Sequence, residues 1–215
     1  MAGSSSKKGQ FPMRRAKKQG EMISRQQVRQ MIRSHDLHTR ELKMRTFVNS
    51  GTLLASGAIG DITTNIPQGD NVSGRTGYQI NVHSIKIWFQ DRMNALANVD
   101  RFRYFLFYDR LNTGTPPVVS DVLDTAYVLS DYSYFARTQN RFKFLVDKTI
   151  PMSITGNSRA VNYEHEFKFK NTVVVDLLGT TTNYGRNSFF YLIMDDLGSN
   201  NSTYAVSCTV RYFDD

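Results

Sequence analysis

The side chains that could carry out acid–base, nucleophilic or metal chemistry are few and scattered along the chain. The four histidines are His35, His38, His83 and His165, and the single cysteine is Cys208. His35 and His38 are three residues apart, which can place two imidazoles on one metal, but no carboxylate or cysteine cluster accompanies them. His83 and His165 fall in alternating, strand-like segments, so we interpret both as structural. The same alternation puts Cys208 on an apolar strand face, which predicts a buried, unreactive thiol.

Catalytic motifs are missing from the sequence. It has no Gly-x-x-x-x-Gly-Lys phosphate loop, no Gly-x-Ser-x-Gly elbow and no His-Glu-x-x-His. Asp195-Asp196 and Asp214-Asp215 are adjacent carboxylates, but neighbours in a strand point to opposite faces, so neither pair forms a dyad by itself. A single cysteine excludes a disulfide framework within the chain and a multi-cysteine zinc site. We therefore expect a protein that is not an enzyme and requires no cofactor.

The strongest chemical signal is a polycationic N-terminal region. Residues 1–40 contain ten basic and two acidic residues, an excess equal to the whole net charge of +8. The remaining residues, 41–215, hold 17 of the 27 basic and 17 of the 19 acidic residues, so the body is neutral. This asymmetry favours an anionic partner, and arginine suits sequence-independent phosphate contacts. The residues predicted to bind nucleic acid are Lys7, Lys8, Arg14, Arg15, Lys17, Lys18, Arg25, Arg29, Arg33 and Arg40.

This region divides into a tail and an arm. Residues 1–22 have too few apolar side chains to form a core, which predicts a disordered basic tail whose clusters also match a nuclear localisation signal. Residues 23–40 are predicted to hold a short amphipathic helix that begins after Ser24 as N-cap. One helix face carries Val28, Met31 and Ile32, and another carries Arg25, Arg29 and Arg33. A cationic face can also be merely solvated or lie on a membrane surface, but the small apolar face and the adjoining basic tail favour nucleic acid.

From residue 43 onward the hydrophobic period changes to two, the period of a β-strand. Glu164–Lys170 is the clearest case, because charged residues alternate there with His165, Phe167 and Phe169. One helical turn is expected at Ser120–Leu123, capped by Ser120 or Asp121. We predict an all-β fold, a single eight-stranded jelly-roll sandwich over residues 41–215 that follows the basic N-terminal arm. The expected strands are Lys43–Val48, Tyr78–Phe89, Arg101–Asp109, Arg141–Lys148, Glu164–Lys170, Thr172–Asp176, Ser188–Asp195 and Thr203–Phe213.

Several expected strands are apolar on both faces, as where Phe105 and Phe107 alternate with Tyr104 and Tyr108. The outer face of a solvated sandwich sheet should be polar. We therefore expect something to cover the second face, and contact with another subunit would do so. No apolar run is long enough to span a membrane, and no apolar stretch of a secretory signal follows the basic N-terminus.

An ordered series of motifs between residues 28 and 157 resembles the coat protein of satellite tobacco necrosis virus and related capsid proteins of small circular single-stranded DNA viruses. The motifs include Val28-Arg29-Gln30-Met31-Ile32, Asn49-Ser50-Gly51, Ile66-Pro67-Gln68-Gly69-Asp70, Phe102-Arg103-Tyr104-Phe105 and Ser153-Ile154-Thr155-Gly156. The resemblance implies a virion protein that assembles with copies of itself into the smallest icosahedral (T=1) shell, with its arms on a single-stranded RNA or DNA genome. Assembly would take place in the host cytoplasm or nucleus, without a membrane partner.

The resemblance also implies structural calcium ions at subunit interfaces. Asp70 matches a calcium-binding aspartate of the family, although an aspartate after Gly69 is equally an ordinary turn residue. Thr76 and Gln79 match positions whose backbone oxygens bind the ion, with Thr76 standing where the family has serine. Asp214, near the C-terminus, is the fourth expected ligand.

Two other functions stay open at this point. A nucleic-acid-binding or movement protein would share the basic tail but would not form shells. A carbohydrate-binding jelly roll would bind glycans with or without the tail.

Overall fold

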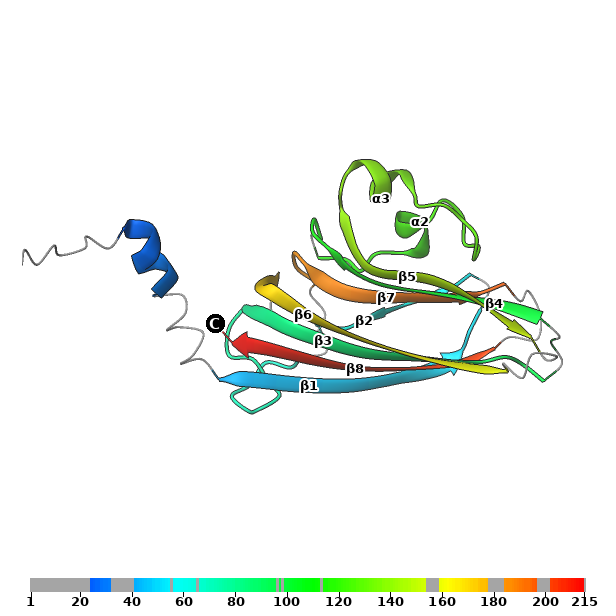
Figure 1. Cartoon of the computed structure of the whole chain (residues 1–215), viewed down its shortest axis with the longest axis horizontal. Helices are drawn as coiled ribbons and strands as arrows, with labels where there is room; N and C mark the ends of the chain where they lie inside the picture. Colours follow the sequence, from blue (N-terminus) through cyan, green and yellow to red (C-terminus); the bar gives the residue numbers. More distant parts are fainter. Residues whose placement is uncertain are drawn as a thin grey trace, which may run out of the picture. The chain divides into compact units, whose positions relative to one another are not determined.

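The computed structural model describes residues 24–31, 41–54, 56–64, 66–95, 97, 99–112, 114–153, 159–177, 184–196 and 202–214. The chain divides into two units, Met1–Thr39 and Arg40–Asp215. In the first unit residues 25–31 are helical. The ten strands and helices labelled in Figure 1 all belong to the second unit. None of the described helices is long and apolar enough to cross a membrane.

Eight strands form two four-stranded antiparallel sheets (Figure 1). The first sheet has the order β1 (Leu42–Thr52), β8 (Thr203–Asp214), β3 (Gln79–Arg92) and β6 (Ala160–Asp176). The second has the order β2 (Ala58–Asp61), β7 (Ser188–Asp195), β4 (Val99–Asp109) and β5 (Phe142–Ser153). Strand β1 pairs with β8, β2 with β7, β3 with β6 and β4 with β5, which is the pairing of a jelly roll. The predicted all-β jelly-roll sandwich is confirmed.

The predicted strand number is right, but two of the strands differ. The short strand β2 was not predicted, because Ala58–Asp61 has too few residues to show an alternation. Conversely, Glu164–Lys170 and Thr172–Asp176 are parts of one strand, β6. The partner strand β3 shifts register between Val82 and Ser84, and this irregularity accompanies the break in alternation that had suggested two strands.

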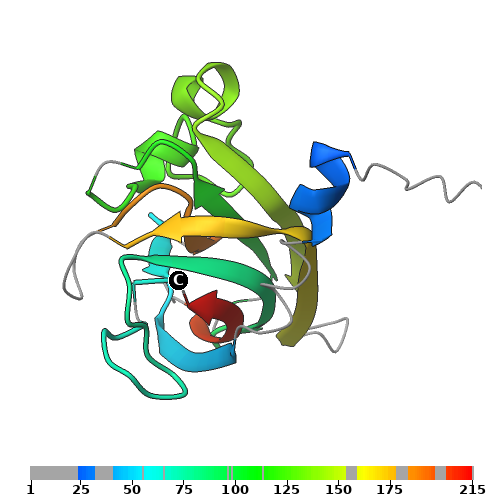
Figure 2. The same cartoon turned by 90° about the vertical axis from the view of Figure 1, so that its left-hand side faces the viewer.

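The main core lies between the two sheets, which Figure 2 shows nearly end-on. Inward residues of β3, β4 and β7, among them Phe89, Tyr104 and Tyr191, are at most 1% exposed. The rings of Phe89 and Tyr104 stack with centroids 4.4 Å apart. Cys208 on β8 is fully buried in this core, as predicted.

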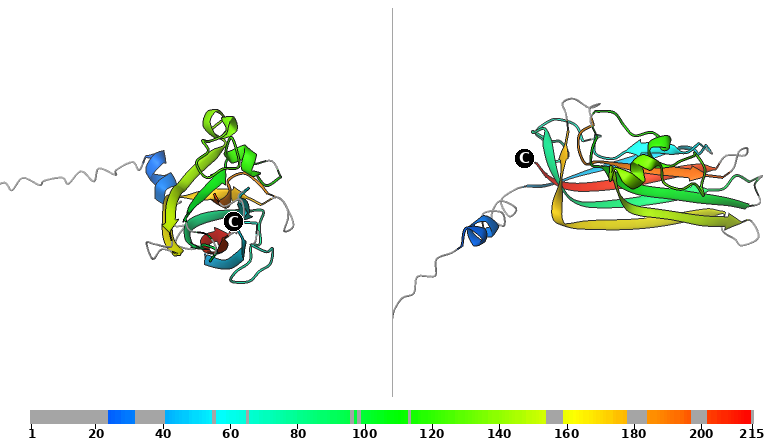
Figure 3. Two further views of the ribbon diagram at one scale, coloured as in Figure 1. Left: turned by 90° about the vertical axis from the view of Figure 1, so that its right-hand side faces the viewer. Right: turned by 90° about the horizontal axis from the view of Figure 1, so that it is seen from above.

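A second core lies on the outer face of the β2–β7–β4–β5 sheet and corrects one expectation. Phe105 and Phe107 of β4 pack there against Val122, Leu123 and Val128. These last three residues belong to the chain's own residues 110–141, which we call the covering segment and which forms an extra layer over this sheet (Figures 1 and 3). The apolar second face of β4 and β7 is therefore covered within the chain, and no other subunit is needed to explain it.

The covering segment contains two short helices, α2 (Val119–Val122) and α3 (Tyr134–Thr138). The predicted cap of α2 at Ser120 or Asp121 is wrong, because the helix begins one residue earlier, after Val118. Asp121 instead reaches back from the first turn and accepts a hydrogen bond from the Val118 N–H at 3.1 Å. Helix α3 was not predicted, and its N-cap is Ser133, whose hydroxyl accepts from the Ala136 N–H.

Candidate nucleic-acid interface and cation site

The described part of the arm is a short capped helix with exposed cations. The Ser24 hydroxyl accepts from the Gln27 N–H at 3.2 Å, and the Gln27 side chain accepts from the Ser24 N–H at 2.9 Å. This reciprocal pair is a capping box, and it confirms Ser24 as N-cap. Arg25 and Arg29 lie four residues apart, so they share a helix face, and both are exposed. The other eight predicted nucleic-acid contacts, among them Arg33 and Arg40, lie outside the described residues.

The buried or half-buried arginines of the body are engaged in the fold. The Arg103 guanidinium makes two hydrogen bonds to Asp147, of 2.9 and 2.8 Å, and two more to backbone carbonyls of the covering segment. Arg141 binds the fully buried Asp109 at 2.8 Å, and Arg101 binds Asp196 at 2.5 Å. These cations hold strands and loops of the body together.

Two of the four residues that the resemblance assigns to calcium lie in contact. The Asp214 carboxylate accepts hydrogen bonds from the Thr76 N–H at 2.7 Å and the Thr76 hydroxyl at 2.8 Å, and it also pairs with Lys43 Nζ at 3.1 Å. Burial would raise the pKa of Asp214, but the bonds from Thr76 and Lys43 outweigh burial and lower it.

The other two residues that the resemblance assigns to calcium, Asp70 and Gln79, are not part of this contact. Asp70 is exposed in the turn between β2 and β3, and the Gln79 amide donates to Asp176 at 2.8 Å. Among the described residues, no group of three or more His, Cys, Asp or Glu is arranged to hold a metal ion. Hydrogen-bond donors and an ammonium group surround Asp214, whereas a calcium ion needs several converging oxygens. Within one chain these residues do not form a ready calcium site.

The histidines of the body have structural surroundings. His165 Nε2 lies 2.8 Å from the Tyr104 hydroxyl at the edge of the core. Burial, with a smaller contribution from the charge of Lys148, lowers the pKa of His165 and favours its neutral form. His83 packs edge-on against Phe213, with ring centroids 5.8 Å apart. His35 and His38 lie outside the described residues.

Sequence reasoning missed a group of buried carboxylates. Asp91, Asp100 and Asp195 are each 0% exposed and lie at the same end of the sandwich. Asp195 had been considered only together with its neighbour Asp196. The signal that could have revealed the group is positional, because each of the three carboxylates occupies an inward, otherwise apolar position of its strand.

The fold and these sites define a structural β-sandwich with a cationic arm, the class to which jelly-roll shell proteins belong. Comparison with known proteins agrees: residues 13–215 match the family model described as satellite tobacco necrosis virus coat protein. The chain belongs to this family of viral coat proteins, which are structural proteins and not enzymes, and it is thus a virion component.

Three curated relatives are similar to this chain. The capsid protein of Satellite tobacco necrosis virus 1 is 36% identical over 61% of this chain, and the match spans 64% of that relative's length. The coat protein of Satellite tobacco necrosis virus 2 is 33% identical over 65% of this chain and 70% of its own length. The coat protein of Maize white line mosaic Satellite virus is 30% identical over 84% of both chains.

Proposed function

We propose that the chain assembles with copies of itself into a T=1 icosahedral shell and packages a single-stranded genome through its basic arm. Its relatives are named capsid or coat proteins, which supports the shell. The observation that carries the packaging role is the separation of charge: ten basic and two acidic residues in 1–40, against a neutral remainder. A cationic segment of this kind binds phosphates without regard to sequence, as a coat must do to hold any part of its genome.

The test compares three full-length or truncated proteins after expression. One is the unchanged chain, one lacks residues 1–22, and one keeps its length but carries glutamine at Lys7, Lys8, Arg14, Arg15, Lys17 and Lys18. Electron microscopy reports whether shells form, and the ratio of nucleic-acid to protein absorbance reports packaging. We expect both variants to package less nucleic acid while the body unfolds at the same urea concentration as before. Packaging equal to that of the unchanged chain would contradict the role of the tail.

Salt dependence gives a second measure of the same interaction. For single strands the logarithm of the binding constant falls with the logarithm of salt concentration by about 0.7 for each phosphate neutralised. The glutamine variant loses six cations and should therefore show a slope smaller by up to about 4. An unchanged slope would mean that these residues do not contact phosphate.

We also propose calcium binding, but only where subunits meet in the shell. The support is the resemblance at Asp70, Thr76, Gln79 and Asp214, together with the Thr76–Asp214 contact within one chain. A second subunit would have to supply further oxygens and displace Lys43 from Asp214. The melting temperature of shells with and without EDTA tests this, and Asp70→Asn should abolish the calcium effect. Shells that melt identically in calcium and EDTA would refute it.

The alternative functions make different predictions. A movement protein or other nucleic-acid-binding protein that forms no shells would scatter light as a small oligomer at all salt and calcium concentrations. A carbohydrate-binding protein would use a groove of about 510 Å³ on the outer face of the first sheet, where Trp88 is 49% exposed. The polar side chains beside Trp88 already bond one another, Gln90 to Asn162 at 2.9 Å and Lys86 to Glu164 at 2.6 Å, which disfavours a sugar site.

A further inference from the structure

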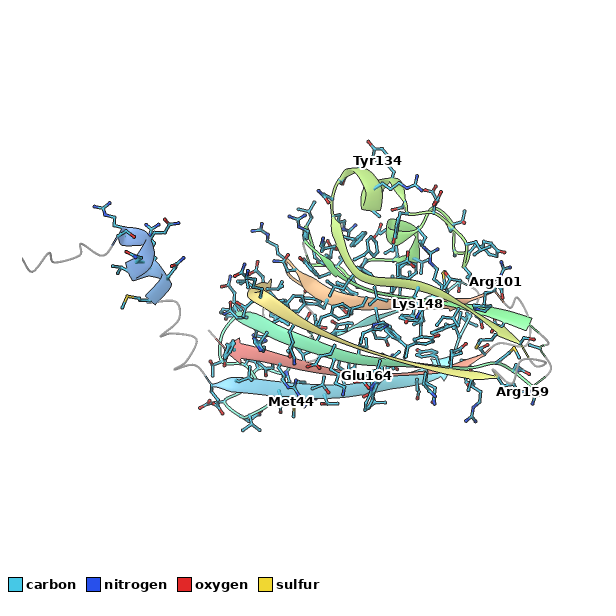
Figure 4. The ribbon with its side chains drawn as sticks, viewed as in Figure 1. Met44, Arg101, Tyr134, Lys148, Arg159 and Glu164 are labelled. Atoms are coloured by element: carbon cyan, nitrogen blue, oxygen red, sulfur yellow. The ribbon has the colours of Figure 1, made fainter. Side chains whose placement is uncertain are left out.

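Three aspartates point into the space between the sheets at one end of the sandwich. Along β3, β4 and β7 the inward positions hold apolar core residues such as Phe89, Phe102 and Ile193. Asp91 takes the inward position two residues after Phe89 in β3, and Asp195 takes it two residues after Ile193 in β7. In β4, Asp100 takes the inward position two residues before Phe102. All three are 0% exposed, so carboxylates rather than apolar groups cap this end of the core. Arg101, which follows Asp100, marks this end in Figure 4.

Ser202 ties two of these carboxylates to neighbouring strands. Its hydroxyl donates to Asp100 at 2.7 Å, and its backbone N–H donates to Asp195 at 3.3 Å. Its carbonyl accepts from the Leu53 N–H at 2.8 Å, just after β1. One residue before β8 therefore connects β4, β7 and the end of β1, and it can do so only while the carboxylates stay in place.

Asp91 enters the group from the opposite sheet without such support. Both of its carboxylate oxygens are shielded from solvent, and neither has a hydrogen-bond partner of good geometry among the described residues. An ionised carboxylate in these surroundings costs several kcal/mol, because nothing replaces its lost hydration. The closed arrangement is therefore compatible with a protonated Asp91 and disfavours an ionised one.

The charged groups that face the cluster do not balance its negative charge when the carboxylates are ionised. Arg101 is in contact with the cluster, where its Nε pairs with Asp196. The register places Tyr204 of β8 and Val161 of β6 beside Asp91, and Met152 of β5 beside Asp100. Arg92 and Arg159 belong to the same end but are exposed.

We propose that Asp91, Asp100, Asp195 and Asp196 form a proton-binding site that holds this end of the sandwich closed while protonated and loosens it when the protons leave. Burial, reinforced by the charges of Asp100 and Asp195, raises the pKa of Asp91 to about 8. Burial also raises the pKa of Asp100 to about 6, in spite of the hydrogen bond from Ser202. Hydrogen bonds from Asp100 and Arg101 outweigh the burial of Asp196 and lower its pKa, so of this pair Asp100 holds a proton more tightly.

The sign of the pH effect follows from these shifts. A carboxyl group whose pKa is raised by folding binds protons more tightly in the folded chain than in the unfolded chain. The contribution of Asp91 and Asp100 to stability is therefore greatest in acid and falls as the pH rises from about 4, the value for an unfolded aspartate, toward the folded values near 6 and 8. Above the folded values negative charges accumulate on β3, β4 and β7 and push the two sheets apart at this end.

The test uses the full-length chain and two matched variants, Asp91→Asn and Asp131→Asn. Asp131 is an exposed carboxylate, 80% accessible, and serves as the control. The urea midpoint is measured between about pH 5 and 9, together with hydrogen exchange of residues 89–93 and 202–204 corrected for its intrinsic pH dependence. We expect the midpoint of the unchanged chain and of Asp131→Asn to fall with rising pH while exchange at this end quickens. Asp91→Asn should flatten the fall between about pH 6 and 8.

A slope in Asp91→Asn equal to that of the unchanged chain would overturn the proposal. If Asp91→Asn fails to fold, infrared spectroscopy of Asp61→Asn decides, because that variant removes the carboxyl outside the cluster whose pKa is about 7. A protonated carboxylic acid band of this variant at neutral pH that disappears in alkali supports the proton-binding site, and its absence at neutral pH overturns it. Both readouts concern the fold of the body, so their outcome does not depend on shell assembly or packaging.

Discussion

Replacing Arg103 should release the covering segment from the β4–β7 face. The side chain is 10% exposed, and its guanidinium makes two hydrogen bonds to Asp147 and one each to the carbonyls of Val128 and Ser130, of 2.9 and 2.7 Å. Removing one partner of a buried ion pair costs about 3–5 kcal/mol. Asp147 is 24% exposed and keeps a hydrogen bond from Tyr132, so for Arg103→Met we expect a loss smaller than this range, about 2–3 kcal/mol.

Urea unfolding of the full-length chain measures this loss, and hydrogen exchange of residues 118–138 locates it. Arg137→Met is the matched control, because the Arg137–Asp131 pair is 51% and 80% exposed and should contribute about 0.5 kcal/mol or less. The double variant Arg103→Met with Asp147→Leu should recover part of the loss, since no unpaired buried charge remains. A loss in Arg103→Met no larger than in Arg137→Met, or unchanged exchange in the covering segment, would refute the reasoning.

Three further outcomes follow from single residues. Burial raises the pKa of Asp61 to about 7, so this carboxyl should add to the decline of stability between about pH 4 and 7, by at most about 1.4 kcal/mol per pH unit, and Asp61→Asn should make the decline in urea titrations shallower while the share of Asp91 and Asp100 remains. Cys208 is fully buried and burial raises its pKa, so a thiol reagent should label it only after unfolding; labelling of the folded chain would place it at the surface. Phe107→Ala should cost about 3–5 kcal/mol in urea unfolding, because its ring is 0% exposed and packs on Phe142, Phe144 and Phe190.

Alternation of residue character along the chain made most strands predictable. Burial alternates at every residue over 205–212 in β8 and over 164–170 in β6. Strand β2 carries no such pattern, since its four residues are all half-buried and its place is set by pairing with β7. Local sequence cannot reveal an element whose hydrogen bonds come from a strand more than a hundred residues away.

The candidate sites likewise divide into those that neighbouring residues predict and those that only the tertiary structure brings together. The Ser24 cap could be predicted because it depends on neighbouring residues. The covering segment could not, because the apolar outer residues of β4 and β7 are equally consistent with a partner subunit or with the chain's own loop. The buried carboxylates depend on three strands of two sheets meeting at one end, which only the tertiary structure brings together.

Several cations of residues 41–215 are engaged in the fold, and this bears on function. Of their 17 cations, Arg103, Arg141, Arg101 and Lys43 are joined to carboxylates that are themselves buried or half-buried. Moving any of these cations to a phosphate would leave a carboxylate unpaired in a poorly hydrated place, at a cost of several kcal/mol. The body therefore cannot easily lend its buried cations to a polyanion. Residues 1–40 hold ten cations and two acids, so if the packaging proposal is right, adding or removing cations there should change nucleic-acid binding without disturbing the jelly roll.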